Sequence, residues 1–342
     1  MTKRKKTVVI CVVCLLAAGI ILCSVFLGLY FAHDEVESYR SAGYIMTSTV
    51  NGARDAEELP LSDLTHIIFG FVCVNDNSVI PTISEADEKA LSTLRDYKVA
   101  HPSVKLMISL NGNGFCYVSR TPQRRRELAE NLKPIIQNYD IDGIDVDWEY
   151  PMRNTNGYKH CVHDAADYAA LMETFRETYG ADFELSIALS GSVTFMNDLN
   201  NRRMAKTLDF VNVMTYDLGL RNHCGYTEPA SSMFNAYLAG YKKSQLNLGL
   251  PFYERCNDKE YDYKEFDELT AMIERGEIFY KSTYEYGYAD YQGHRLSFDS
   301  REYLMRKVEL VKRRGYGGVF CWHLGANMDG SLMREARRIL QG

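Results

Sequence analysis

The fold is decided by the stretch Asp140-Ile141-Asp142-Gly143-Ile144-Asp145-Val146-Asp147-Trp148-Glu149-Tyr150-Pro151. Acidic residues alternate here with Ile, Val and Trp. Strict alternation is typical of a half-buried β-strand, because successive side chains of a strand point to opposite faces. One face of the predicted strand carries Asp145, Asp147 and Glu149. The other face carries Ile144, Val146 and Trp148.

Three carboxylates on one face of a strand repel one another when all are ionised, so we expect at least one of their pKa values to be raised. Neighbouring carboxyl groups with separated pKa values are how enzymes keep one of them as an acid. This stretch therefore predicts acid catalysis. A purely structural acidic strand is the weaker interpretation, because buried carboxylates are costly without partners.

The same stretch also fits a calcium-binding loop, with ligand offsets filled by Asn138, Asp140, Asp142, Gly143 and Glu149. Such a loop needs a helix on each side. The residues from Pro151 onward do not resemble an exiting helix, and the loop does not explain the alternating Ile and Val. The strand is the preferred interpretation.

Short apolar runs and amphipathic stretches alternate along the rest of the chain. The predicted strands are Ala42–Met46, Thr65–Cys73, Val104–Leu110, Gly143–Trp148, Phe183–Leu189, Phe210–Thr215, Asn247–Phe252 and Gly318–Trp322. The predicted helices are Glu85–Lys98, Gln123–Tyr139, Ala165–Tyr179, Ser231–Lys243 and Arg301–Arg314. Eight strands separated by helices predict an α/β fold, a TIM (β/α)8 barrel, with a small insertion at residues 254–298 before strand eight.

A basic cluster, Lys3-Arg4-Lys5-Lys6, precedes an uncharged run from Thr7 to Phe31. About 20 apolar residues cross a bilayer, so residues 1–31 are predicted to be a cytoplasmic stub and a transmembrane signal anchor. Residues 32–41 would be a linker and residues 42–342 an extracytoplasmic catalytic domain. A cleaved signal peptide, giving a secreted protein, is the alternative.

The chain of 342 residues has a net charge of −6, and its first 33 residues carry four positive and no negative charges, which leaves −10 for the remainder. An acidic surface argues against nucleic acid or anionic lipid as a partner. No second module is evident, and a monomer is expected.

Six of the nine cysteines follow the apolar run: Cys73, Cys116, Cys161, Cys224, Cys256 and Cys321. An even number is compatible with disulfides, whose pairing the spacing leaves open, and equally with free or buried thiols. No C-x-x-C pair lies outside the apolar run, so we predict neither a metal site nor a cofactor.

The motifs resemble those of family 18 glycoside hydrolases, the chitinase-like enzymes. Residues Asp142 to Glu149 match the D-x-x-D-x-D-x-E motif of that family. Further matches are Gly43-Tyr44, Met214-Thr215-Tyr216-Asp217, Gly249-Leu250-Pro251-Phe252-Tyr253 and Gly317-Gly318-Val319-Phe320-Cys321-Trp322. The similarity extends from Gly43 to Leu324, in the family's order.

The resemblance implies hydrolysis assisted by the acetamido group of the substrate. Glu149 would be the general acid and base. Asp147 would orient the acetamido group, Asp145 would share a proton with Asp147, and Tyr216 would donate to the acetamido oxygen. Trp322 would form the floor under the sugar, with plain core packing as the weaker alternative.

The pocket is expected to be lined also by Tyr44, Phe71, Met214, Asp217 and Tyr253, although apolar strand ends are as often barrel core. Asp142 and Ser109 are expected to support the carboxylates without taking part in the chemistry.

Two positions depart from the family pattern. Asn111 stands where S-x-G-G has its first Gly, and Glu254 stands where P-F-Y-G-R has Gly. Glu254 is expected to place a charge at the rim of the cleft, and neither residue is expected to contact the catalytic carboxylates.

The leading hypothesis is cleavage of β-1,4 bonds next to N-acetylglucosamine, in chitin or chitooligosaccharides. An endo-β-N-acetylglucosaminidase acting on N-glycans or cell-wall glycan is the first alternative. An inactive sugar-binding lectin is the second, although such lectins typically lack the acid at the position of Glu149. With two Trp in the chain, soluble oligosaccharides are favoured over crystalline polymer.

Overall fold

The computed structural model describes residues 36–154, 161–218, 223, 225–256 and 263–342, together with 18–21, 24–25 and 28. The chain divides into two compact units, Met1–Glu35 and Val36–Gly342. The sheets and the candidate site belong to the second unit.

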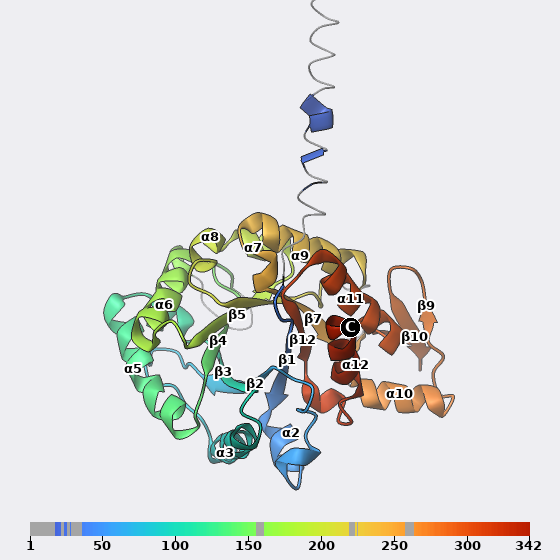
Figure 1. Cartoon of the computed structure of the whole chain (residues 1–342), viewed down its shortest axis with the longest axis horizontal. Helices are drawn as coiled ribbons and strands as arrows, with labels where there is room; N and C mark the ends of the chain where they lie inside the picture. Colours follow the sequence, from blue (N-terminus) through green and yellow to red (C-terminus); the bar gives the residue numbers. More distant parts are fainter. Residues whose placement is uncertain are drawn as a thin grey trace, which may run out of the picture. The chain divides into compact units, whose positions relative to one another are not determined.

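Eight parallel strands close into a barrel in the order β1-β12-β7-β6-β5-β4-β3-β2, with helices around it (Figure 1). The strands are β1 (Arg40–Met46), β2 (His66–Cys73), β3 (Lys105–Asn111), β4 (Gly143–Asp147), β5 (Glu184–Ser190), β6 (Phe210–Met214), β7 (Leu246–Pro251) and β12 (Gly318–Trp322). Each lies within two residues of a predicted strand. The TIM barrel is therefore confirmed.

The helices that cover the barrel begin at side-chain caps that the sequence contains. Ser84 forms a capping box with Asp87, and Thr121 and Ser300 each accept a backbone N–H of the first turn. The longer helices are α3 (Glu85–Ala100), α5 (Pro122–Asn138), α6 (Asp164–Tyr179), α9 (Thr227–Ala239), α11 (Arg301–Arg314) and α12 (Ser331–Gln341). Helix α9 begins four residues before its predicted start, and α12 was not predicted.

Short helices occupy several connections at the carboxyl ends of the strands. They are α2 (Thr47–Gly52) after β1, α4 (Phe115–Ser119) after β3, and α7 (Val193–Asn197) and α8 (Asn201–Met204) after β5. Functional groups of TIM barrels lie at this end, and Phe195 of α7 lines the cleft described below.

The chain between β7 and α11 forms a second sheet with the order β8-β11-β10-β9. Its elements are β8 (Arg255–Cys256), α10 (Phe266–Glu274), β9 (Lys281–Ser282), β10 (Gly287–Tyr291) and β11 (His294–Ser297). Figure 1 shows α10, β9 and β10 at the right-hand edge, next to α11 and α12. The sheet has an apolar cluster of its own, composed of Leu269, Met272, Ile278, Ala289, Leu296 and Phe298.

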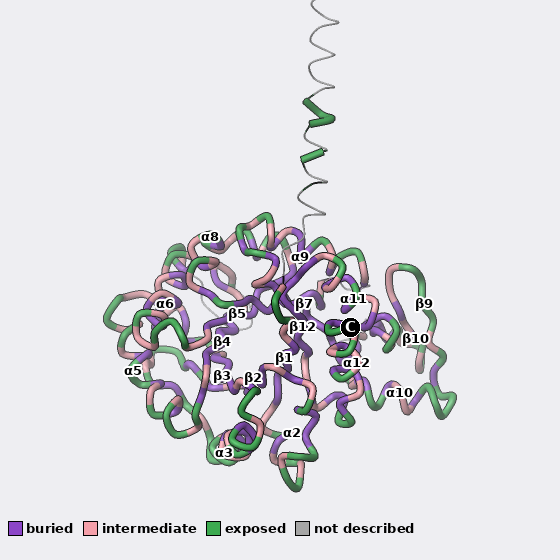
Figure 2. The backbone as a smooth tube through the Cα atoms, in the orientation of Figure 1, coloured by how far each residue is buried: buried purple, intermediate pink, exposed green. Residues whose placement is uncertain are grey.

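The alternation predicted for β4 determines which side chains enter the barrel. Ile144, Val146 and Trp148 pack outward into the large core between strands and helices. Trp148 stacks on Phe115 with ring centroids 5.4 Å apart. Figure 2 shows the strands buried and the exposed residues concentrated on the outer helices and loops. The acids of β4 therefore face the barrel interior.

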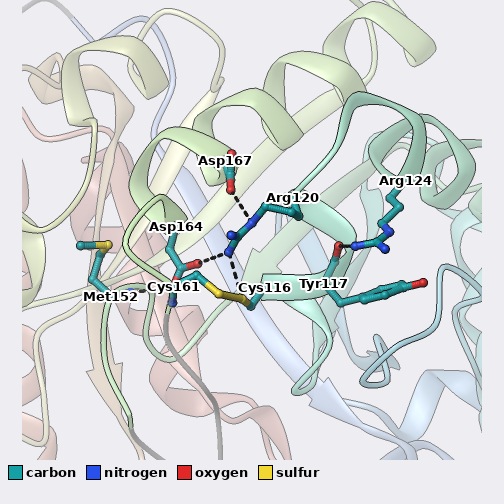
Figure 3. The surroundings of a disulfide bond; sticks show 8 residues. All are labelled: Cys116, Tyr117, Arg120, Arg124, Met152, Cys161, Asp164 and Asp167. Atoms are coloured by element: carbon teal, nitrogen blue, oxygen red, sulfur yellow. Dashed lines mark hydrogen bonds and ion pairs between the residues drawn. A yellow bond between two sulfur atoms is a disulfide. The ribbon is translucent and has the colours of Figure 1, made fainter.

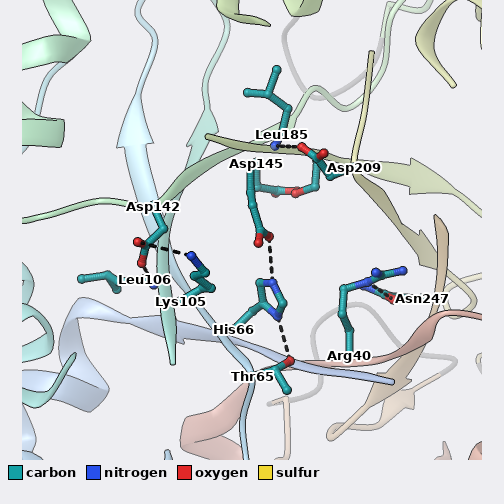
Figure 4. A network of polar contacts seen from close by, with 12 residues as sticks. Arg40, Thr65, His66, Lys105, Leu106, Asp142, Asp145, Leu185, Asp209 and Asn247 are labelled. Carbon is teal, nitrogen blue, oxygen red and sulfur yellow. Dashed lines mark hydrogen bonds and ion pairs between the residues drawn. The ribbon is translucent and has the colours of Figure 1, made fainter. Parts of the chain in front are cut away.

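The amino-terminal end of the barrel holds a separate polar network (Figure 4). Asp142 precedes β4 and accepts the Leu106 backbone N–H at 2.8 Å, and it pairs with Lys98 Nζ at 2.9 Å. Lys98 also pairs with Asp140 at 2.8 Å. Because a strand precedes Glu149 and a lysine neutralises both Asp140 and Asp142, the calcium-loop alternative is wrong.

No helix within the described residues is both long and apolar enough to cross a bilayer. Much of the predicted anchor, residues 7–31, lies outside the described residues, and positions 18–21, 24–25 and 28 are helical. The structure does not support the predicted transmembrane helix, which stays a prediction.

Candidate active site

Two acids of β4 lie buried in the barrel at different depths. Asp145 is 0% exposed and Asp147 is 5% exposed. Glu149, two residues further, is half-buried. Three peptide bonds are cis: Gly70–Phe71 within β2, Glu149–Tyr150 shortly after β4, and Trp322–His323 at the end of β12. The three carboxylates thus lie in sequence from the barrel interior toward its carboxyl end.

Asp145 is held by hydroxyl groups from the two neighbouring strands, β3 and β5, and from β1, which is not paired with β4. Its Oδ2 accepts Tyr44 Oη at 2.8 Å and Ser109 Oγ at 2.9 Å, and its Oδ1 accepts Ser186 Oγ at 2.6 Å. Burial raises the pKa of Asp145, and these hydrogen bonds act in the opposite direction. Ser109 supports the carboxylate as expected.

The sharing of a proton between Asp145 and Asp147 stays a prediction. Asp147 Oδ2 accepts Asn111 Nδ2 at 3.0 Å, while Oδ1 is buried and accepts no hydrogen bond from an N–H or hydroxyl group of the described residues. Burial, followed by the charges of Glu149 and Asp145, raises the pKa of Asp147 well above its usual value.

A cavity of about 160 Å³ opens over these acids at the carboxyl end of the barrel. It is lined by Tyr44, Phe71, Asn111, Asp147, Glu149, Ala188, Met214, Tyr216, Phe320 and Trp322. The rings of Phe71 and Trp322 stack at 5.8 Å with an interplanar angle of 25°. Trp322 is partly exposed and presents an aromatic surface to the cavity, so it is not merely core packing.

Glu149, Met214, Tyr216 and Trp322 also line a wider cleft of about 570 Å³. The remaining lining residues are Met46, Tyr150, Ser190, Ser192, Phe195, Asp217, Leu218, Tyr253, Arg255, Tyr263 and His323. Glu149 therefore lies where the inner cavity meets the open cleft. Burial and the charges of Glu149 and Asp147 raise the pKa of Tyr216 well above its usual value, so its hydroxyl remains protonated.

Asp217, predicted to bind substrate, is already surrounded by protein donors. Its Oδ1 lies 2.7 Å from His223 Nδ1 and its Oδ2 accepts Tyr253 Oη at 2.9 Å. Arg255 binds both oxygens. Burial alone would raise the pKa of Asp217, but Arg255 and His223 hold it well below the usual range. Asp217 stays ionised at the wall of the cleft.

A row of buried hydrogen bonds runs through the barrel to Asp145. Arg40 Nε donates to Asn247 Oδ1 at 3.1 Å, and Asn247 Nδ2 donates to Asn212 Oδ1 at 3.0 Å. Asn212 Nδ2 then donates to the Tyr44 hydroxyl at 3.1 Å, and that hydroxyl donates to Asp145. The strand periodicity that placed the acids on the inner face also applies to Asn212 and Asn247, which we did not predict.

Three expectations about this site are wrong. Asp142 lies at the opposite end of β4, about 16 Å from Asp147 at ~3.3 Å per residue, and supports strand pairing. Asn111 contacts the catalytic carboxylates directly. Glu254 is 1% exposed and places no charge at the rim, because its carboxyl turns inward, where burial raises its pKa to about 7.

A disulfide joins Cys116 of α4 to Cys161, which precedes α6 (Figure 3). It therefore connects the segments that follow β3 and β4. Asp164 lies beside it, and the three residues bring possible metal-binding atoms within 4.8 Å of one another. The sulfurs are bonded to each other and cannot serve as thiolate ligands in this state. The arrangement is a cross-link at the edge of the site.

Comparison with known proteins agrees with this geometry. Residues 38–327 match the model of the glycosyl hydrolases family 18. The Class V chitinase of Arabidopsis thaliana is 23% identical over 335 residues, covering 82% of this chain and 86% of that protein. The family 18 N-acetylglucosaminidase of Paenibacillus barengoltzii superposes with a TM-score of 0.78 at 24% identity, covering 89% of this chain and 100% of that one. The chitinase-like agglutinin of Robinia pseudoacacia gives 0.74 at 23% identity, with coverages of 88% and 99%. The chain therefore belongs to glycosyl hydrolase family 18 and is a glycoside hydrolase.

Proposed function

We propose that the enzyme hydrolyses β-1,4 glycosidic bonds adjacent to N-acetylglucosamine, by a retaining mechanism assisted by the substrate's acetamido group. One observation carries the proposal: Asp147, Glu149, Tyr216 and Trp322 line one cavity. Asp147 supplies a carboxylate acceptor, Glu149 an acid, Tyr216 a hydroxyl donor and Trp322 an aromatic floor. These are the groups that such a reaction requires.

Glu149 serves as general acid and then as general base. It gives its proton to the leaving glycosidic oxygen as the bond to the anomeric carbon breaks. In the second step it takes a proton from the water that attacks the same carbon from the side of the departed group. Its position between the inner cavity and the open cleft supports this role, because the leaving group and the water enter from the cleft.

Asp147 and Tyr216 act on the acetamido group. Asp147 Oδ1 accepts no hydrogen bond from an N–H or hydroxyl group in the described part of the chain and can accept the acetamido N–H. The Tyr216 hydroxyl donates to the acetamido oxygen and aligns it for attack on the anomeric carbon. The oxygen forms the new bond as the leaving group departs, giving an oxazolinium intermediate that ionised Asp147 stabilises.

The aromatic residues determine how the sugar lies. Trp322 provides a flat surface against the pyranose C–H bonds, supported from one side by Phe71 and from another by Tyr44 at 5.6 Å. Met214, Tyr253 and Asp217 border the same space on the cleft side. Trp148 is committed to the outer core, which leaves one tryptophan for substrate. This supports short soluble oligosaccharides over crystalline chitin.

The test is to incubate the exported part, residues 34–342, with chitooligosaccharides, a high-mannose glycopeptide and peptidoglycan. Glu149→Gln is the inactive variant, and Glu177→Gln, at an exposed position on α6, is the matched control. Cleavage of chitooligosaccharides by wild type and Glu177→Gln alone supports the proposal. Cleavage of the glycopeptide instead makes the enzyme an endo-β-N-acetylglucosaminidase. Binding without cleavage by all three proteins makes it a lectin.

We also propose that the catalytic domain is extracytoplasmic, anchored through residues 1–31. The basic cluster before an uncharged run supports this orientation. The Cys116–Cys161 disulfide supports an oxidising compartment. Protease treatment of intact cells, followed by detection of each end of the chain, tests it: loss of the carboxyl-terminal domain is expected, and its protection in sealed cells would contradict export.

A further inference from the structure

Asn111 ends β3 and is fixed by its neighbours on both sides. It is in register with Cys73 of β2 and with Asp147 of β4. Its backbone carbonyl accepts the Val74 N–H at 2.8 Å. The next residue, Gly112, has a φ of +139°, and a Cβ there would lie 2.3 Å from the Val74 carbonyl oxygen. The backbone that carries the Asn111 side chain is therefore held in place.

The Asn111 amide makes two hydrogen bonds to the same residue. Nδ2 donates to Asp147 Oδ2 at 3.0 Å and to the Asp147 backbone oxygen at 3.1 Å. A side chain held through both its backbone and its carboxyl group has little rotational freedom. With Oδ2 fixed to Asn111, Oδ1 is the atom left to serve the cavity, which Asn111 and Asp147 both line.

The charged and titratable groups around Asp147 give this amide a further role. On its own segment lie Asp145, Glu149 and Tyr150, and the other elements present tyrosines to it: Tyr44 from β1, Tyr168 from α6 and Tyr216 from β6. No lysine, arginine or histidine in the described part of the chain pairs with Asp147. The Asn111 amide thus supplies, without a charge, stabilisation of the ionised carboxylate that a cation would otherwise give.

Asp145 has hydrogen-bond donors of its own, because its two oxygens accept the hydroxyl groups of Tyr44, Ser109 and Ser186. Each acid of β4 therefore has its own donors. We propose that Asn111 is a positioning residue that holds Asp147, with Oδ2 fixed and Oδ1 presented to the acetamido N–H. This inference rests on the proposed function and specifies how its oxazolinium intermediate is stabilised.

The variants are Asn111→Ala, which removes both hydrogen bonds, and Asn111→Asp, which keeps the shape but replaces the donor with a carboxyl. Asn113→Ala is the matched control, since Asn113 lies in the same loop and accepts the Asp76 N–H at 2.9 Å without contacting the acids. Hydrogen bonds to charged groups are among the stronger ones, so kcat on a chitooligosaccharide should fall about ten- to hundredfold in Asn111→Ala, with KM within ~2-fold.

The pH dependence separates positioning from a structural role. The Asn111 N–H favours the ionised form of Asp147, so its removal should move the acid limb of the kcat/KM profile to higher pH, and Asn111→Asp should move it further. Asn113→Ala should match wild type. An Asn111→Ala enzyme with unchanged kcat and pH profile would overturn the inference.

A measurement without substrate distinguishes this inference from the proposed function. ¹³C NMR titration of aspartate carboxyls, with Asp147 assigned through Asp147→Asn, should show Asp147 titrating at higher pH in both Asn111 variants than in wild type. That shift would uphold the inference about position even in a protein that cleaves nothing. If Asn111→Ala does not fold, the isosteric Asn111→Asp decides, and an unshifted Asp147 in it contradicts the inference.

Discussion

Arg255 binds both carboxylate oxygens of Asp217, with Nε 2.8 Å from Oδ1 and a terminal nitrogen 2.6 Å from Oδ2. Arg255 belongs to β8 of the small sheet, and Asp217 follows β6 of the barrel. The pair thus fastens the inserted sheet to the wall of the cleft. Asp217 has a positive φ of 56°, a conformation that aspartate tolerates better than most residues.

Arg255→Ala should lower stability at neutral pH and lose that effect in acid. The pKa of Asp217 is lowered in the folded protein, so the stabilisation is fully present above the unfolded value of about 3.9. It declines as pH falls below that value and is lost only as pH falls through the lowered pKa of the folded state, so the effect should be smaller at pH 3 than at pH 7. Because Arg255 is 55% exposed, solvent screening limits the effect to ~1 kcal/mol. Urea unfolding at pH 7 and pH 3 measures it. Arg275→Ala, which breaks an exposed pair with Glu277, should change neither value.

The two tryptophans should report different events. Trp322→Phe should weaken sugar binding, since the larger ring surface is lost, and should abolish any change of tryptophan fluorescence caused by a chitooligosaccharide. Trp148 lies in the outer core, so Trp148→Phe should lower the free energy of unfolding by ~1–3 kcal/mol. It should keep the change of tryptophan fluorescence that the chitooligosaccharide causes. A fluorescence response that persists in Trp322→Phe and disappears in Trp148→Phe would contradict the role of Trp322 as the surface that binds the sugar.

Glu254→Gln should stabilise the protein above neutral pH. The folded state holds the Glu254 pKa at about 7, raised by burial, so the stability associated with the neutral carboxyl is present below about pH 4.5 and is lost as pH rises through 7. Gln keeps the shape without the charge. A gain of at most ~3 kcal/mol at pH 8 and little change at pH 4 are expected in thermal unfolding. Equal effects at both pH values would contradict this explanation.

Cys161→Ser should destabilise the domain by about 2–4 kcal/mol, because the disulfide closes a loop across a sequence separation of 45 residues. Cys73→Ser is the matched control, since Cys73 is an exposed free thiol. Denaturant unfolding with and without a reducing agent measures the difference. Wild type should respond to the reductant and Cys161→Ser should not.

The barrel could be predicted because the residue pattern within each strand is enough to identify it as a strand. In β4, the alternation of Ile144 and Val146 with acids identifies both a strand and its inner face. Helix α12 could have been predicted in the same way, since its apolar residues recur at helical spacing and are buried: Leu332, Met333, Ala336 and Leu340.

The partners of the carboxylates could not be predicted from spacing alone. Asn111 and Ser186 come from β3 and β5, and only the register between neighbouring strands brings them beside Asp147 and Asp145. The error about Asp142 has the same origin, since membership of a motif does not say at which end of a strand a side chain lies. The position of Glu254 was predicted wrongly because successive side chains of an extended segment point to opposite sides. A shift of one residue therefore moves a side chain from the rim of the cleft to the interior.

The row from Arg40 to Asp145 gives the barrel interior a direction. Each hydrogen bond of the row is donated toward Asp145. If the side-chain amide of Asn212 or Asn247 were turned over, two oxygens or two NH₂ groups would face each other, so the direction of the row is fixed. Hydrogen bonds aligned in one sense polarise one another. The amide and hydroxyl dipoles therefore add up, with their negative ends toward the Arg40 guanidinium and their positive ends toward the Asp145 carboxylate. The same row thus stabilises a cation at the amino-terminal end of the barrel and an anion beneath the cavity.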